Sequence, residues 1–533
     1  MSIIKMRTDF QRVTREEEHL MKTFVLSFNE LEEYSRFNLI LIVTLTALVL
    51  AFSPALAANK MTDQEISDAI EDEISWDLAV PAHRIIVIST DGVVTLSGNV
   101  DNVLAKERAV RIAETVKGVR SVIDEIEVRP SLLLTDQQIK DTVIAALLAN
   151  PATESYKIDV KVSDNSVNLS GTVDSWQEKR LAVKVAKGVR GVSSVQDNLL
   201  LDFKQQRSDA EIAKEIQNRM KWDVLVDHGL IDVQVESGNV TLRGIVGSAA
   251  EKQRAIHDAY VANVKDVTAT KLKVERWARD EDLRKDKYTV KSDQEISQAV
   301  KDALIYDPRV KEYNISTRVE NGTITLRGEV DSLAAIRAAA DDARNTVGVV
   351  WVDNRLRVSP KTALDDRQLE LKVSDAIERN TFIGEKEITV KVENGVARLE
   401  GTVDTFFEKA QAEEMASIIK GVLIVDNNLQ VNQTYRPFLY EPHIYSRYPY
   451  GYRWYHYTPP LSVKSDARIK QDIKDELWWS PFVDAGDVNV AVDEGVATLT
   501  GTVQSWSESY AAMENAYEGG ANRVYNNLDV KPQ

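Results

Sequence analysis

Apolar positions along this chain follow two different periods, which alternate in a fixed order. Ile212, Ile216 and Met220 recur every four residues, which predicts an amphipathic helix. Residues 158–162 (IDVKV) alternate between apolar and polar, which predicts a half-buried strand. The segments follow the order helix, strand, strand, helix, strand. Because this order recurs along most of the chain, we interpret the chain as repeated copies of one small unit.

A Leu-x-Gly-x-Val motif marks each copy. It occurs six times, and successive motifs lie 73, 73, 84, 73 and 100 residues apart. Its glycines are Gly98, Gly171, Gly244, Gly328, Gly401 and Gly501. Each glycine shares a face of its strand with the Leu and the Val of the motif. We therefore interpret it as a structural residue that lets a helix approach the sheet closely.

Each copy begins with a residue that can cap a helix, 36 positions before the glycine. The caps are Thr62, Thr135, Ser208, Ser292, Asp365 and Ser465. Five of the six are followed three residues later by Glu or Gln, which predicts a capping box that satisfies two amides at a helix start. The sixth cap has Arg468 at that position. The caps therefore predict where six helices begin.

Turn residues separate the two alternating strands in most copies. Asp91-Gly92 and Asn394-Gly395 are examples, and such pairs predict a hairpin. A second helical pattern and a short apolar strand complete each copy. Two helices of this kind bury their apolar stripes against one face of a sheet. The sequence thus predicts an α+β fold of six tandem small αββαβ sandwiches, each a three-stranded mixed sheet with two helices on one face, after an N-terminal apolar segment.

The repeats divide the chain into segments. A leader with a signal peptide or anchor spans 1–57. The repeats, called repeat 1 to repeat 6 from here on, span 60–129, 134–202, 207–275, 291–359, 364–433 and 465–532. A charged linker, 276–290, precedes repeat 4, and an aromatic insert rich in Tyr, Arg and Pro, 434–464, precedes repeat 6. The other linkers are short, so we expect neighbouring repeats to touch one another.

The leader has the pattern of an export signal. No charged residue occurs from Phe37 to Ala58, and Pro54 ends the apolar core of this run. Residues 55–57 (ALA) then match the small-x-small pattern of a cleavage site. Two interpretations stay open: cleavage after Ala57, or retention as a membrane anchor, because the uncharged run is long enough to span a bilayer. Both place the repeats outside the cytoplasm, and we expect a periplasmic location.

Composition narrows the classes of function. A formal net charge of −17 gives no electrostatic footprint for binding nucleic acid. The absence of cysteine excludes disulfides, thiolate metal sites, cysteine nucleophiles and a lipid-bearing N-terminal cysteine. The sequence contains no nucleophile elbow, zinc-protease, phosphate-loop or dinucleotide motif, and its six histidines are scattered. We therefore expect no catalytic residue, no cofactor and no metal ion.

Aromatic residues at two helix positions are the candidate contact residues of the repeats. Four stand at the end of a first helix: Trp76, Trp222, Tyr306 and Trp479. Three stand at the start of a second helix: Trp176, Phe406 and Trp506. The first group either enters a membrane interface or closes the open end of a small core. The second group is either exposed for binding or forms a hydrophobic staple.

The insert has a composition found nowhere else in the chain. Residues 434–460 contain ten aromatic residues and five prolines, and three arginines make the segment cationic. Its candidate contacts are Tyr448, Tyr450, Tyr452, Arg453, Trp454 and Tyr455. Tyr and Arg dominate binding hot spots, so binding to a lipid headgroup, a polysaccharide or a protein is one interpretation. A strap packed on neighbouring repeats and a disordered linker are the others.

The capped helix, Ile/Val-rich strand, Asn-Gly-type turn, Val-x-Leu-x-Gly-x-Val strand and second helix together resemble the BON domain. The resemblance covers residues 60–532 almost entirely. It implies a non-enzymatic, exported protein of the periplasm, related to osmotic stress, that attaches to membrane phospholipid or another envelope component. The alternative is a structural spacer or interaction scaffold in the envelope, with a protein partner bound through 434–460. No nucleic-acid partner is expected.

Overall fold

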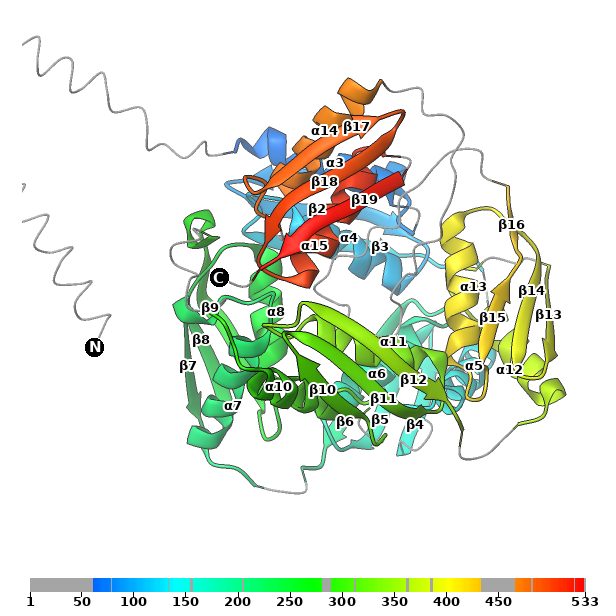
Figure 1. Ribbon diagram of the computed structural model, residues 1–533. Helices are drawn as coiled ribbons and strands as arrows, with labels where there is room; N and C mark the ends of the chain where they lie inside the picture. Colours follow the sequence, from blue (N-terminus) through cyan, green and yellow to red (C-terminus); the bar gives the residue numbers. More distant parts are fainter. Residues whose placement is uncertain are drawn as a thin grey trace, which may run out of the picture. The chain divides into compact units, whose positions relative to one another are not determined.

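Each Leu-x-Gly-x-Val motif lies in the middle strand of a small sheet in the computed structural model (Figure 1). The structure describes residues 61–531 apart from 78, 133, 154–156, 204–205, 280–288, 311–312, 361–363, 384–386, 433–464, 481–482 and 522. The chain separates into two units, residues 1–61 and 62–533. All described helices and strands belong to the second unit.

Repeat 1 shows the architecture that all six repeats share. Helix α3 (Asp63–Trp76) precedes a hairpin of β1 (Ile85–Thr90) and β2 (Val93–Val100). Helix α4 (Val103–Thr115) then leads to β3 (Ser121–Val128). Strand β2 pairs antiparallel with β1 and parallel with β3, so the sheet is mixed and its order is β1-β2-β3.

The helices of the other repeats occupy the same two places in the order. The first helices are α5 (Asp136–Ala149), α7 (Asp209–Trp222), α10 (Asp293–Tyr306), α12 (Asp366–Glu378) and α14 (Asp466–Trp479). The second helices are α6 (Trp176–Lys187), α8 (Ala249–Ala259), α11 (Leu333–Arg344), α13 (Phe406–Ile418) and α15 (Trp506–Glu518). Short 3-10 turns occur at η1 (Ala82–Arg84), η2 (His228–Leu230) and η3 (Arg276–Arg279).

The strands follow the same scheme. The outer hairpin strands are β4 (Lys157–Ser163), β7 (Ile231–Glu236), β10 (Ser316–Glu320), β13 (Ile388–Glu393) and β17 (Val488–Asp493). The middle strands are β5 (Ser166–Val173), β8 (Asn239–Val246), β11 (Thr323–Val330), β14 (Val396–Val403) and β18 (Val496–Val503). The last strands are β6 (Ser194–Leu201), β9 (Asp266–Val274), β12 (Trp351–Val358) and β19 (Arg523–Val530). In repeat 5 the last strand is split into β15 (Ile424–Asn427) and β16 (Gln430–Val431), which both pair with β14.

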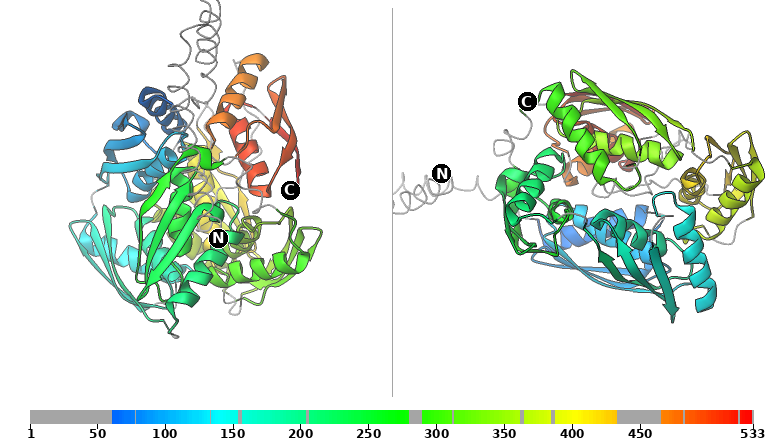
Figure 2. Two further views of the ribbon diagram at one scale, coloured as in Figure 1. Left: turned by 90° about the vertical axis from the view of Figure 1, so that its left-hand side faces the viewer. Right: turned by 90° about the horizontal axis from the view of Figure 1, so that it is seen from below.

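The two helices of each repeat pack on one face of its sheet (Figure 2). In repeat 2, Ile139 and Val143 of α5 and Leu181 of α6 pack with Val167 and Leu169 of β5 in one core, and all five are fully buried. The opposite face of each sheet remains outside the repeat's own core. The predicted α+β fold of six αββαβ sandwiches is confirmed.

The helix caps also form as predicted. The Thr62 hydroxyl accepts a hydrogen bond from the Glu65 amide at 3.2 Å, and the Glu65 carboxylate accepts one from the Thr62 amide at 2.7 Å. These hydrogen bonds lower the pKa of Glu65. The same reciprocal box begins α5, α7, α10 and α12, whereas Ser465 caps α14 by accepting from the Arg468 amide alone. Local sequence therefore determines these helix starts.

An aspartate directly after each cap ties the first helix to the hairpin turn. In repeat 3, the Asp209 carboxylate accepts hydrogen bonds from the amides of Ser237 at 2.7 Å and Gly238 at 2.9 Å. The equivalent aspartates are Asp63, Asp136, Asp293, Asp366 and Asp466, and each accepts from two consecutive turn amides. Sequence analysis did not single these residues out, although an aspartate follows the cap in all six copies.

The motif glycines have a structural role, but the contact that requires them differs from the one we expected. At Gly171 the backbone has φ of +129°, and an added Cβ would overlap the carbonyl oxygen of Lys157 on the adjacent strand. The other five motif glycines also have positive φ and meet the same kind of carbonyl. The close approach is therefore to the hairpin partner's backbone, and the expectation of a close helix was wrong. Only glycine adopts this conformation there without strain.

Candidate contact surfaces

Several of the predicted sites lie outside the described residues. These include the apolar leader, the cleavage site after Ala57 and the insert residues Tyr448, Tyr450, Tyr452, Arg453, Trp454 and Tyr455. Within the described part of the chain, no group of three or more His, Asp or Glu side chains is arranged to hold a metal ion. None of the described helices is long and apolar enough to cross a membrane. The remaining candidates are the helix-end aromatics and the surfaces of the repeats.

The aromatics at the start of the second helices contact other repeats. The Trp176 indole donates a hydrogen bond to the Val264 carbonyl of repeat 3 at 2.9 Å, and its ring centroid lies 4.5 Å from that of Tyr260. In repeat 6, Trp506 lies under the guanidinium of Arg344 of repeat 4, 4.8 Å from the ring centroid. Both tryptophans are half-buried at these contacts. They hold repeats together.

The aromatics at the ends of the first helices do the same. Tyr306 of repeat 4 lies under Arg219 of repeat 3, 4.9 Å from the ring centroid, and hydrogen-bonds Glu215. Burial and the neighbouring Glu215 carboxylate raise the pKa of Tyr306 to about 12. The Trp222 carbonyl of repeat 3 accepts a hydrogen bond from the Val347 amide of repeat 4 at 2.9 Å. These residues therefore lie between repeats 3 and 4.

This placement corrects our expectations for the helix-end aromatics. The rings of Trp176, Tyr306 and Trp506 neither present a free surface nor act only within their own repeat, because each contacts another repeat. Trp222 contacts repeat 4 through its backbone carbonyl, so the role expected of its ring stays a prediction. For Trp76, Phe406 and Trp479 the structure describes the helical backbone alone. The recurrence of these residues is visible in the sequence, but their partners lie on other repeats and are not.

Contacts between second helices follow one register. A residue nine positions after the motif glycine of one repeat meets a residue sixteen positions after the glycine of another repeat. The pairs are Glu107 with Lys187, Arg180 with Tyr260, Gln253 with Glu114, and Arg337 with Ser417. Repeats 1, 2 and 3 thereby contact one another in a closed cycle, and repeat 4 contacts repeat 5 in the same way.

A second kind of contact, an isolated backbone bridge, joins repeat 2 to repeat 5 and repeat 3 to repeat 4. Val189 of repeat 2 and Asn380 of repeat 5 form an isolated antiparallel bridge, flanked by a hydrogen bond from the Arg190 amide to the Arg379 carbonyl at 3.0 Å. Repeats 3 and 4 form the equivalent bridge through Asp223 and Thr346. We expected neighbouring repeats to touch; the structure adds contacts between repeats that are distant in sequence.

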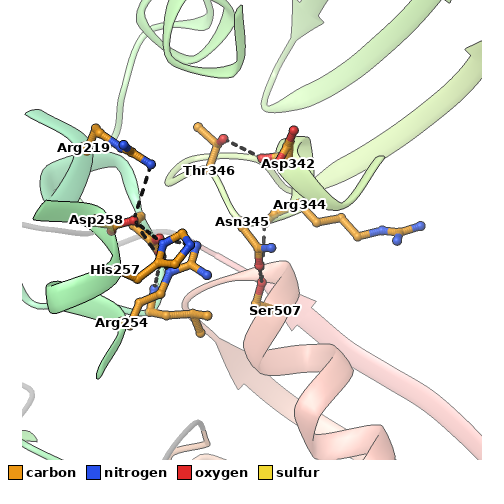
Figure 3. A network of polar contacts seen from close by, with 11 residues as sticks. Arg219, Arg254, His257, Asp258, Asp342, Arg344, Asn345, Thr346 and Ser507 are labelled. Atoms are coloured by element: carbon orange, nitrogen blue, oxygen red, sulfur yellow. Dashed lines mark hydrogen bonds and ion pairs between the residues drawn. The ribbon is translucent and has the colours of Figure 1, made fainter. Parts of the chain in front are cut away.

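The contact between repeats 3 and 4 encloses a polar network, which repeat 6 also reaches (Figure 3). Asp258 is fully buried and lies 3.9 Å from Arg219 and 4.0 Å from Arg254. Ser507 of repeat 6 donates a hydrogen bond to the Asn345 side chain at 3.1 Å. The ion pairs of Asp258 lie within repeat 3, whereas the Ser507 hydrogen bond joins repeat 6 to repeat 4.

Repeats 1 and 6 meet through a pair of carboxyl groups. Glu73 of α3 and Glu476 of α14 share a hydrogen bond between their side chains. Burial raises the pKa of both, that of Glu476 to about 7, which favours one proton held between the two carboxyl groups. Nearby, the Lys117 ammonium of repeat 1 donates to the Trp478 carbonyl at 2.6 Å and lies 3.7 Å from that ring's centroid.

The outer face of the repeat 1 sheet is an exposed apolar surface. Ile86, Ile88 and Ile123 are 59%, 57% and 47% exposed. The strand register places Ile88, Thr95 and Ile123 in one row across the three strands. The sequence signal was present, because Ile85-Ile-Val-Ile88 is a continuous apolar run where other repeats alternate. We did not single it out.

The same face is polar in repeat 2. There Asp159, Lys161 and Gln196 occupy the positions of the three isoleucines. In repeats 4 and 5 these positions also carry charge, for example Arg318 and Lys391. The apolar outer face therefore distinguishes repeat 1 from these copies of the unit.

Comparison with protein families gives one result over most of the chain. The protein-family model described as "BON domain" matches six segments of the chain: 62–130, 135–202, 208–276, 292–360, 365–433 and 465–532. Each match contains one αββαβ unit of the structure.

Three curated proteins are similar to parts of the chain. Osmotically-inducible protein Y of Escherichia coli is 34% identical over 147 residues, which are 26% of this chain and 73% of that protein. The 21 kDa hemolysin of Actinobacillus pleuropneumoniae is 26% identical over 27% of this chain and 75% of its own length. The outer membrane lipoprotein DolP of Haemophilus influenzae is 25% identical over 28% of this chain and 79% of its own length.

Proposed function

Because the chain belongs to the BON domain family and carries six copies of the domain, we propose that it is an exported, non-enzymatic protein of the cell envelope that attaches to membrane phospholipid or another envelope surface. We further propose that it acts in the periplasm under osmotic stress. The observation that carries the proposal is the similarity to osmotically-inducible protein Y and to a lipoprotein named for the outer membrane. The uncharged run before repeat 1 supports export.

The structure argues against the simplest alternative, a spacer in which six repeats give length. A spacer needs its repeats in linear order, each touching only its neighbours. Here repeat 2 bridges to repeat 5, and repeat 1 contacts repeat 3 through Glu114 and Gln253. Such contacts fold the array back on itself. An interaction scaffold remains compatible with this arrangement.

Export and attachment are tested by fractionation and by N-terminal sequencing. We expect a soluble fraction released by osmotic shock with Ala58 as the first residue, or a membrane fraction that keeps the leader if the segment acts as an anchor. Recovery of an intact chain in the cytosol would contradict export. A vesicle flotation assay with the chain from Ala58 onward then tests lipid attachment. If the protein floats with none of the vesicle compositions tested, the result favours the scaffold.

The insert extends the proposal to a second contact, a protein partner or an envelope component bound through 434–460. Ten aromatic residues in a passive linker would expose apolar area at a cost of about 25 cal/mol per Å². Deletion of 434–460 should therefore leave six folded repeats, with unchanged circular dichroism per residue, and weaken envelope attachment. If the deletion unfolds repeats 5 and 6 instead, the segment is a structural strap and this part of the proposal fails.

A further inference from the structure

We propose that the outer face of the repeat 1 sheet is the lipid-contacting surface of this protein and that its isoleucines enter the apolar edge of a zwitterionic bilayer. The inference rests on the proposed function, because it names the surface through which envelope attachment takes place. Its basis is the geometry of the exposed face, the distribution of charge around it, its size and its position in the chain.

The geometry concentrates the apolar side chains. Ile88 and Ile123 flank Thr95 in one row of the sheet, and Ile86 lies beside Ser97 in the next. Side chains on one face of a sheet recur every second residue, so Ile86 and Ile88 point to the same side. The third row, Thr90, Val93 and Ser121, adds no charge. All three isoleucines are about half exposed with the whole chain in place, so no other repeat covers them.

Charge selects the kind of lipid. The three rows contain one charged residue, Glu125 at the end of the Ile86 row, and Glu127 follows it on the same strand face. The whole chain carries a net charge of −17. An anionic surface would therefore repel the protein, whereas the Ile88 and Thr90 rows, which contain no charged residue, enter a zwitterionic layer without desolvating a charge.

The size of the face argues against a second copy of the chain as its partner. Three strands and three rows span about 10 Å by about 13 Å between backbone positions, which gives a footprint of a few hundred Å² at most. A stable protein interface buries about 800 Å² on each partner. A fluid lipid surface needs no complementary shape. A small apolar face is therefore enough for membrane binding when a membrane anchor in the same chain, or several other weak contacts, hold the protein at the surface.

The position in the chain supports the same assignment. Only residues 59–61 separate Ala58, where the apolar segment ends, from the helix cap Thr62. Three residues span about 10 Å when extended. In an anchored form, repeat 1 would thus be the repeat held at the membrane, and repeat 1 is the one with the apolar outer face.

Repeat 2 supplies the variant that tests the inference. Ile86→Asp, Ile88→Lys and Ile123→Gln together place on repeat 1 the residues that repeat 2 carries at the same sheet positions, Asp159, Lys161 and Gln196, in a fold that accepts them. Ile88→Thr with Ile123→Thr is a milder variant that keeps residues favoured in strands. The matched control is Lys161→Gln in repeat 2, which changes the equivalent surface without touching repeat 1.

The assay is flotation of the chain from Ala58 onward with phosphatidylcholine and phosphatidylethanolamine vesicles, with phosphatidylglycerol vesicles in parallel. We expect the triple variant to lose binding about tenfold or more, the milder variant to lose part of it, and the control to bind like wild type. Weaker wild-type binding to phosphatidylglycerol at low salt is also expected. If wild type and folded variants bind zwitterionic vesicles equally, the inference is wrong and the proposed function stands.

Two other outcomes separate the inference from the proposed function. If wild type binds no vesicle, the lipid arm of the proposed function fails and the inference fails with it. If wild type is a dimer in solution and the triple variant a monomer, the face is an interface between copies and the inference is contradicted. Hydrogen exchange of the repeat 1 core residues confirms that each variant is folded before its binding is compared.

Discussion

Glu73 of repeat 1 and Glu476 of repeat 6 stand eleven residues after their helix caps and share a hydrogen bond, so two equivalent positions meet across a contact between repeats. Repeats 2 and 5, and repeats 3 and 4, join through backbone bridges instead. The contact between repeats 1 and 6 therefore depends on a proton in a way that the other two do not. Asp72, Asp77, Asp472 and Asp475 surround the pair and raise these pKa values further.

The contact between repeats 1 and 6 should weaken as the pH rises. A carboxyl group whose pKa is raised on folding gives its full stabilisation below its ordinary pKa, 4.5, and loses it as the pH rises through the folded value, about 7 for Glu476. We expect faster hydrogen exchange in α3 and α14 at pH 8 than at pH 5, after correction for intrinsic rates. Glu476→Gln should remove most of this difference, and Glu71→Gln, on the exposed side of α3, should not.

Part of the pH dependence of overall stability has another origin. Burial raises the pKa of Glu114, between repeats 1 and 3, to about 8. Glu476→Gln should therefore leave a smaller loss of thermal stability between pH 5 and pH 8. Exchange rates in α3 and α14 that are the same at both pH values in wild type would refute the proton-dependent contact.

Gly171→Ala should destabilise repeat 2 by about 2 kcal/mol or more. The backbone at Gly171 has φ of +129° and an added Cβ overlaps the Lys157 carbonyl, so a single methyl group is enough. Gly229→Ala is the matched control, because an added Cβ there meets only the Asp227 side chain at 3.5 Å. Chemical denaturation of both variants measures the difference. A Gly171→Ala variant as stable as the control would show that the strand contact does not require glycine.

Asp209→Ala should cost repeat 3 about 1 to 3 kcal/mol. The variant loses two hydrogen bonds from the Ser237 and Gly238 amides to a charged acceptor, and Gly238 is buried. Asp232→Ala, on the outer face of the same repeat, serves as control. Thermal unfolding followed by circular dichroism compares the two, and equal midpoints would mean that the turn finds other partners at no cost.

Trp176→Ala should loosen the contact between repeats 2 and 3 without unfolding either. It removes the hydrogen bond to the Val264 carbonyl and the ring contact with Tyr260, each worth about 1 kcal/mol. We expect faster hydrogen exchange at 260–264 and unchanged exchange in the repeat 2 core around Leu169. Loss of protection throughout repeat 2 would instead assign Trp176 to the core of its own repeat.

The sequence was a good guide wherever the cause of a structure is local. Thr62 with Glu65, or Thr135 with Gln138, predicts a helix start because both partners lie within one turn, and the structure contains these boxes. Alternating strands around Asp91-Gly92 predict a hairpin for the same reason. The repeated spacing then gave the fold of all six units from one.

Contacts between repeats were beyond the sequence for a physical reason. Trp176 and Trp506 occupy equivalent positions, yet Trp176 contacts Tyr260 and Trp506 contacts Arg344. The residues next to each tryptophan in the sequence do not indicate which residue it contacts. The role of Gly171 was misassigned because a face-sharing pattern does not distinguish a helix above the sheet from a carbonyl on the adjacent strand. Ile86 and Ile88 were visible as a continuous apolar run, but only burial shows which of its members are exposed.

The most direct test of the account is whether the outer face of repeat 1 meets lipid. The chain has no cysteine, so Ile88→Cys and Lys161→Cys each provide one labelling site at equivalent positions of repeats 1 and 2. We would attach an environment-sensitive fluorophore at each position and add phosphatidylcholine vesicles that contain nitroxide-labelled lipid. The account predicts that the label at 88 shifts to the blue and is quenched by the nitroxide, while the label at 161 does neither. Equal responses at the two positions, or none at 88 while the protein still floats with the vesicles, would contradict it.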